Sequence, residues 1–168
     1  MLIPAPDALV ELFKPWNKFY SHSKLTVTLV MFAHTAGLVV AGGIAIATDR
    51  LTLRAKAWSD SDRVHHLAEV ALLHRTVVSA LTVTILSGAL MLTSDLETFW
   101  GSWIYWVKMA MVVILLANGA RMLTVEKALA NDSSVTSPHW ARLRFNAVAS
   151  MSLWLGITLA GLALVNFA

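Results

Sequence analysis

Four long runs of apolar residues dominate the pattern of hydrophobic and polar positions along the chain. They cover about residues 25–48, 70–93, 103–123 and 143–167, and shorter polar segments separate them. Each run is about as long as the roughly 20 residues that a helix needs to cross the hydrocarbon core of a bilayer. A helix also satisfies its backbone hydrogen bonds internally, as a segment in lipid must. The pattern predicts an all-α fold, an integral membrane four-helix bundle.

The N-terminal segment, residues 1–24, has a different pattern from the rest of the chain. Leu12, Trp16 and Phe19 recur at helical spacing, while Lys14 and Lys18 fall on other faces. Such an amphipathic helix lies in the membrane interface or packs on its own bundle, and the sequence leaves both open. We therefore expect two parts, an amphipathic N-terminal segment and a four-transmembrane-helix domain over residues 25–168.

Polar residues mark the ends of the predicted helices. The segment Ser59-Asp60-Ser61-Asp62 supplies an N-cap and an acidic first turn well before the second apolar run. Ser137-Pro138 is a cap followed by proline at the first helical position. The third helix can continue past Arg121 through Lys127. We expect these helices to project beyond the membrane on one side.

Composition excludes an ordinary soluble domain. The chain is 57% hydrophobic and 14% charged, whereas soluble domains carry about 25% charged residues. It has no cysteine, which excludes disulfides and thiolate metal sites. The net charge of +3 forms no basic stripe, so we expect the lipid bilayer, and no nucleic acid, as a partner.

The basic residues predict the orientation of the bundle. The loop between the first two runs and the loop between the last two contain Arg50, Arg54, Lys56 and Arg63, and Arg121, Lys127, Arg142 and Arg144. The loop between runs two and three and the C-terminus contain none. Because basic loops stay on the cytoplasmic side, we expect both termini to be periplasmic in a bacterial inner membrane. The lysines of the N-terminal segment argue the other way but are outnumbered.

Histidines are candidate ligands for a haem, which needs two of them at the same depth. At about 1.5 Å of rise per residue, His34 and His74 differ in depth by about 13 Å and cannot share an iron. His66, or its neighbour His65, matches His139 at the cytoplasmic edge. A single haem b on His66 and His139 therefore remains open, and a di-haem cytochrome is disfavoured.

Copper is the favoured metal. Met31 and His34 share a helix face, and Met91, Met109 and Met111 come from other runs in the same half of the membrane. Thioether and imidazole ligands together suit Cu(I), so the predicted metal site is His34, Met31 and Met109. The alternatives are that the methionines fill the core and that His34 bonds a hydroxyl such as that of Thr84.

Other polar residues within the runs have structural explanations. Lys108 can snorkel to the surface or pair with Asp95 or Glu97. A layer of polar residues either closes the cytoplasmic end or holds an anionic lipid head group. That layer comprises His74, Arg75, Asn118, Arg121 and Asn146.

Small residues recur along two of the runs. They are Gly37, Ala41 and Gly42 in the first run and Gly156 and Gly161 in the fourth. Small residues allow close helix packing or an interface with another subunit. No nucleophile–base pair, membrane-embedded carboxylate pair or phosphate-binding glycine loop is found, so we expect no enzyme.

The chain resembles membrane proteins of the copper resistance D type (CopD-like) over about residues 31–121. The resemblance rests on short motifs: His34 with Gly37 and Gly42-Gly43, Ser87-Gly88, Trp100-Gly101, Lys108 and Asn118. Small uncharacterised four-helix bacterial families share a similar pattern, including Asp49-Arg50-Leu51. The resemblance implies copper handling in or across the inner membrane, with His34 as the one transferable metal contact. The chain is short for a full copper-resistance transporter and has no cysteine ligands, so the resemblance does not imply that it transports copper.

Two functions follow as hypotheses. The first is a metal-handling membrane protein, with copper favoured over haem. The second is a non-catalytic accessory subunit that docks other membrane subunits through lipid-facing helices.

Overall fold

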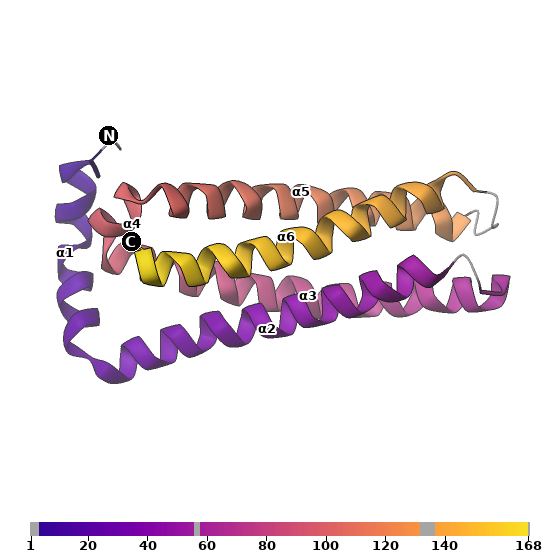
Figure 1. Ribbon diagram of the computed structural model, residues 1–168. Helices are drawn as coiled ribbons and strands as arrows, with labels where there is room; N and C mark the ends of the chain where they lie inside the picture. Colours follow the sequence, from indigo (N-terminus) through magenta and orange to yellow (C-terminus); the bar gives the residue numbers. More distant parts are fainter. Residues whose placement is uncertain (1–3, 56–57, 132–136, 168) are drawn as a thin grey trace.

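The computed structural model describes residues 4–55, 58–131 and 137–167, and all the regular elements in these ranges are helices. They are α1 (Asp7–His22), α2 (Lys24–Arg54), α3 (Asp60–Ser94), α4 (Leu96–Gly101), α5 (Trp103–Asn131) and α6 (His139–Phe167). The four long helices α2, α3, α5 and α6 run side by side, and α1 crosses one end of them (Figure 1). The predicted all-α four-helix bundle is confirmed.

The four long helices are long and apolar enough to cross a membrane. Their outer faces carry large apolar side chains that are more than half exposed, including Phe32, Leu86, Val113 and Leu159. A soluble monomer rarely exposes apolar surface on this scale. Length, composition and surface therefore agree with the multi-pass arrangement that the sequence predicts.

The helices extend beyond the apolar runs at one end, as the polar caps predict. We call this the loop end, because the α2–α3 and α5–α6 connections lie there, and the opposite end the α1 end (Figure 1). At the loop end, α3 begins at Asp60 and α5 continues to Asn131. The Ser59 hydroxyl caps α3 by accepting a hydrogen bond from the backbone N–H of Asp62 at 3.2 Å. The short helix α4 was not predicted; the Asp95 side chain caps it.

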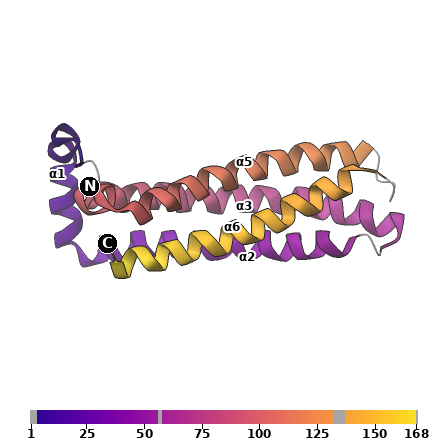
Figure 2. The same ribbon diagram turned by 45° about the horizontal axis from the view of Figure 1, so that its top comes forward.

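Helix α1 is bound to the bundle through α3. The Trp16 Nε1 group donates to the carbonyl of Leu90 at 3.0 Å, and the Asn17 amide donates to the carbonyl of Ser94 at 2.6 Å. None of its described residues is buried, and the second view shows it lying across the bundle end (Figure 2). The sequence left open whether this helix packs on its own bundle or lies in the membrane interface. The structure shows contact with the bundle, and exposed residues such as Phe19 leave an apolar surface that a membrane interface could cover.

Close packing joins α2 to α3 and to α6. A Cβ atom added at Gly37 would lie 2.8 Å from the carbonyl oxygen of Ala80 on α3, and one added at Gly42 would lie 3.0 Å from the Trp154 ring on α6. The small residues of α2 thus serve helix packing within the chain. Helices α5 and α6 pack along their length, whereas α3 and α5 meet at few residues.

The buried apolar residues form three clusters along the bundle. At the loop end lie Ala55, Leu67, Leu129, Trp140 and Leu143; in the middle lie Ala41, Leu115, Trp154 and Ile157; at the α1 end lie Ile104, Ala160 and Leu164. The sparse contact between α3 and α5 leaves space between these clusters, and the cavities of the molecule occupy it.

Candidate functional site

The first candidate site is a cavity of about 320 Å³ in the half of the bundle nearer α1. We call it the Lys108 cavity. Its walls come from α2, α3, α4, α5 and α6 and are mainly apolar, with Leu81, Ile85, Val112 and Ile157 among them. Its polar side chains include His34, Lys108 and Tyr105. The cavity therefore combines a small set of hydrogen-bonding groups with a large apolar surface.

The His34 imidazole is held in one orientation by α3. Its Nδ1 atom lies 2.9 Å from the backbone carbonyl of Thr84 and 3.3 Å from the Ser87 hydroxyl. A carbonyl oxygen only accepts, so Nδ1 carries the proton, and the neutral ring has its lone pair on Nε2. Gly88 makes the approach possible, since a Cβ atom there would lie 3.0 Å from His34 Cε1.

The predicted partner of His34 was correct as a residue and wrong as an atom. The Thr84 carbonyl, and not its hydroxyl, accepts from the ring. The Thr84 hydroxyl donates to the carbonyl of Ala80 at 3.0 Å, and the hydroxyl near the ring is that of Ser87. Within the described residues the Nε2 atom of His34 makes no hydrogen bond. It is the free polar atom of this side chain.

Lys108 reaches into the bundle instead of pairing at its surface. It lines the cavity with His34 and lies close enough to interact with it electrostatically. The ammonium Nζ would be 3.6 Å from a Cβ atom placed on Gly161 of α6. In the described part of the chain no ion pair or hydrogen bond joins Lys108 to Asp95, Glu97 or another residue, so the predicted pairing is not formed.

The methionines of the predicted copper site are divided between two places. Met91 and Met109 line the Lys108 cavity together with His34. Met31 is 50% exposed and does not line that cavity. Among the described residues no three His, Cys, Asp or Glu side chains converge to hold a metal ion. One imidazole and two thioethers are thus the ligands that this cavity offers to copper.

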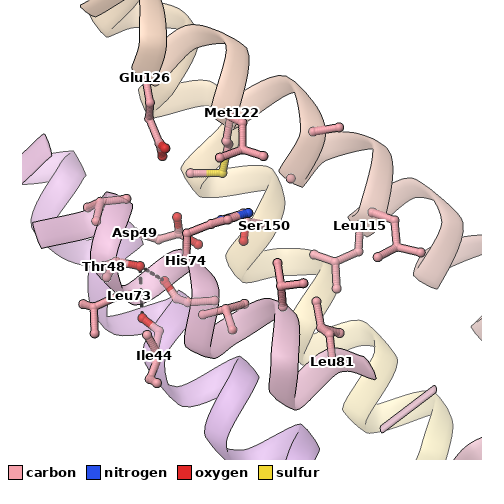
Figure 3. A pocket seen from close by; sticks show the side chains of 18 of the residues that line it. Ile44, Thr48, Asp49, Leu73, His74, Leu81, Leu115, Met122, Glu126 and Ser150 are labelled. Carbon is pink, nitrogen blue, oxygen red and sulfur yellow. Dashed lines mark hydrogen bonds between the residues drawn. The ribbon is translucent and has the colours of Figure 1, made fainter. Parts of the chain in front are cut away.

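A second cavity, of about 270 Å³, lies nearer the loop end. We call it the Asp49 cavity. All four long helices contribute a polar group to it: Asp49 from α2, His74 from α3, Glu126 from α5 and Ser150 from α6. In Figure 3 the side chains of Asp49, His74 and Ser150 lie in the middle of the view, and the Glu126 carboxylate points towards them.

Asp49 is the most deeply buried ionisable group of this cavity, with 2% of its surface exposed. The Ser150 hydroxyl hydrogen-bonds its carboxylate, and Glu126 lies close enough to interact with it electrostatically. The Oδ2 atom is buried without a hydrogen-bond partner. Native proteins seldom leave a buried carboxylate oxygen unsatisfied.

The two cavities adjoin and open on the same side of the bundle. They share Leu81 on α3, Leu115 and Leu116 on α5 and Trp154 on α6. Exposed side chains line both, namely Ile85 in the Lys108 cavity, Val78 in the Asp49 cavity and Leu116 in each. A ligand could therefore enter either cavity from the apolar surface between α3 and α5.

The predicted polar layer separates into an inner and an outer part. The Asn118 amide donates to the carbonyl of Asn146 at 3.0 Å, and both residues are buried. His74 faces the Asp49 cavity. Arg75 and Arg121 are exposed, so they are not part of a closed cluster.

The candidate haem ligands have different surroundings. His66 is buried, its Nε2 atom lies 2.9 Å from the Thr52 hydroxyl, and its ring contacts Trp58 edge-on at 5.2 Å. The His139 Nδ1 atom is buried without a partner in the described residues. Coordination of iron through His66 Nε2 would have to break the Thr52 bond, and the haem remains a prediction.

From the sequence, Asp49 was noted only as part of the Asp49-Arg50-Leu51 motif, and Glu126 was not singled out. Asp49 directly follows the first apolar run and Glu126 lies beyond the third, so neither stands out as a charge inside an apolar run. Helical spacing could have predicted that Asp49 faces the bundle interior. Asp49 follows Gly42 by seven residues, so it shares the face on which the small residues of α2 pack inward.

The chain was compared with protein-family models, curated proteins and solved structures, and none of them matches it. The resemblance to the copper resistance D type therefore remains a prediction from the residues alone.

Proposed function

We propose that this protein is a membrane-embedded binding protein for a small amphipathic acid. The acidic group binds between Lys108 and His34, and the apolar body fills the rest of the Lys108 cavity. The observation that carries the proposal is an ammonium group without an ion-pair partner among the described residues, lining a mainly apolar cavity.

The charge of Lys108 decides the class of ligand. Ionisable groups at membrane depth are costly unless they are paired, and they mark ligand or ion pathways. An anionic oxygen is the partner that an ammonium requires. The lone pair on His34 Nε2 can accept an O–H from a singly protonated phosphate or from a hydroxyl next to a carboxylate, because a carboxylate itself only accepts. Together the two side chains favour a carboxylic or phosphoric acid group.

The shape of the cavity favours an apolar body on that ligand. Its volume of about 320 Å³ lies within the roughly 300–1,000 Å³ of small-molecule sites. Its opening between α3 and α5, marked by Ile85 and Leu116, faces the apolar surface of the bundle. A molecule that partitions into the bilayer has direct access to it.

The test is fluorescence titration of the full chain in mild detergent with 11-(dansylamino)undecanoic acid and with its methyl ester. We expect the acid to bind and Lys108→Met to weaken it at least about tenfold, which corresponds to about 1.4 kcal/mol. The ester lacks the anionic oxygen, so its binding should be weak and unchanged by the substitution. Lys18→Met, which removes an exposed lysine of α1, is the matched control. Equal binding of the acid by the native chain and Lys108→Met would refute the proposal.

Copper is the second candidate function. The observation in its favour is that Met91 and Met109 line the same cavity as His34, whose Nε2 atom is free to bind a metal. An imidazole fixed through its other nitrogen is the usual arrangement of a histidine ligand. The charge of Lys108 opposes this function, because it repels a cation in the same cavity.

The same variants separate the two candidates. Elemental analysis of protein purified without added metal should find about one copper per chain if the site holds copper, and none in His34→Ala. Lys108→Met would then raise copper occupancy, because a repelling charge is removed, while it weakens binding of the acid. Absence of copper from the native protein would count against the copper function.

A further inference from the structure

The Asp49 cavity contains two carboxyl groups, and its other ionisable lining residue is His74. Asp49 and Glu126 both line it, and the Oδ2 atom of Asp49 is buried and unpartnered. No lysine or arginine is among its lining residues. Lys127 lines the neighbouring cavity at the loop end, not this one, and makes no ion pair with Glu126 in the described part of the chain.

A bound metal ion is a poor match for this arrangement. Asp49, His74 and Glu126 come from three helices, and the described residues contain no group of three such side chains that converges on a metal position. The space is also too large for a bare ion, at about 270 Å³. An organic cation, which joins a charged group to an apolar part, fits both the carboxyl groups and the volume of the cavity.

The residues that line the cavity indicate that the rest of this ligand is apolar. Apolar side chains from α2, α3 and α5 line most of it, including Ile44, Leu73 and Leu115. Trp154 adds an aromatic ring, and aromatic rings also attract cations. Hydroxyl groups are few; that of Thr48 is donated to the carbonyls of Ile44 and Ala45.

We propose that the Asp49 cavity is a binding site for a small organic cation, an ammonium group on a compact apolar body. The ammonium lies beside the Asp49 and Glu126 carboxyl groups, and the apolar body contacts Leu73, Leu115 and Trp154. Entry is from the surface between α3 and α5. This site differs from the adjoining Lys108 cavity in its ionisable residues and in the charge of its ligand, although the two cavities share Leu115 and Trp154.

The experiment uses 1-adamantanamine, which joins an ammonium to a compact hydrocarbon cage, and the uncharged 1-adamantanol as its comparison. Binding to the full chain in lipid nanodiscs is measured by isothermal titration calorimetry. We expect the amine to bind with one site per chain and the alcohol to bind at least tenfold more weakly. Equal binding of the two compounds, or no binding of the amine, would overturn the proposal.

Substitutions then locate the site. Asp49→Asn keeps the shape of the side chain and an oxygen for the Ser150 hydroxyl but removes the charge, so amine affinity should fall at least tenfold. Glu126→Gln acts from the edge of the cavity and should reduce affinity by a smaller factor. Should Asp49→Asn fail to fold, Glu126→Gln decides the question.

The matched control is Glu69→Gln, which removes an exposed carboxylate that lies 3.3 Å from His65. It should bind the amine as the native chain does. An amine affinity that is the same in Asp49→Asn and Glu126→Gln as in the native chain would show that the cation binds elsewhere.

Discussion

A few individual side chains concentrate the polar chemistry of this bundle. Lys108 and Asp49 are a basic and an acidic group that line adjoining cavities. His34 is oriented through its Nδ1 atom and keeps Nε2 free. Each of these groups lacks part of the pairing that burial demands, which is the physical reason for assigning ligands to the cavities.

Substitution of the single residue Asp49 should change the stability of the protein. Asp49→Asn should raise the free energy of unfolding of the ligand-free protein by about 1–3 kcal/mol, because the amide can accept from Ser150 without the cost of an unsatisfied charged oxygen. Thermal unfolding followed by circular dichroism in detergent measures the change. Glu69→Gln, at an exposed position, should stay within about 0.5 kcal/mol.

A loss of stability in Asp49→Asn larger than that control would contradict this account. It would mean that the carboxylate has a structural role in joining α2 to α6 through Ser150.

Among the elements, the spacing between α2 and its neighbours is set by glycines. Gly37 lies against the backbone of α3 at Ala80, and Gly42 lies against the ring of Trp154. The Gly37 contact also holds α2 in place beside Thr84 and so brings His34 within reach of the Thr84 carbonyl. The position of His34 in the candidate site thus depends on the close packing of α2 against α3.

Two alanine substitutions in α2 should have opposite effects. Gly37→Ala should destabilise the bundle by about 1–3 kcal/mol, since its Cβ would press on backbone atoms that cannot move aside. Gly43→Ala, in the same helix, meets nothing within 4 Å and should stabilise it by up to about 1 kcal/mol through helix propensity. Unfolding in a denaturing detergent compares them. Equal effects of the two substitutions would show that close packing at Gly37 is not limiting.

At the scale of the whole molecule, the bundle is asymmetric. α1 and α4 lie at one end and the longer helical extensions lie at the other (Figure 1). The basic residues favour the loop end as the cytoplasmic side. The exposed apolar faces of the four long helices fit lipid or a partner subunit equally well, so the accessory-subunit hypothesis stays a prediction beside the binding function.

Orientation is directly testable because the chain has no cysteine. Glu97→Cys in α4 and Ser61→Cys in α3 place single thiols at exposed positions of opposite ends. In intact bacterial cells a membrane-impermeant maleimide should label Glu97→Cys, and should label Ser61→Cys only after permeabilisation. The reverse pattern would place both termini in the cytoplasm.

The sequence by itself determined the number, type and approximate limits of the long helices. Apolar runs of membrane-spanning length have few alternatives to helix, and caps such as Ser59 act over one turn. It also identified His34, Lys108 and the glycines of α2 as residues of interest, since ionisable and small residues stand out in an apolar run.

Only the tertiary structure decided which of these residues meet. The loose contact between α3 and α5 creates the cavities, and rotation of each helix about its axis places Met109 inside and leaves Met31 exposed. Asp49, His74, Glu126 and Ser150 come from four helices, and no local pattern relates them. Their convergence depends on the side-chain packing between helices, which composition and periodicity do not contain.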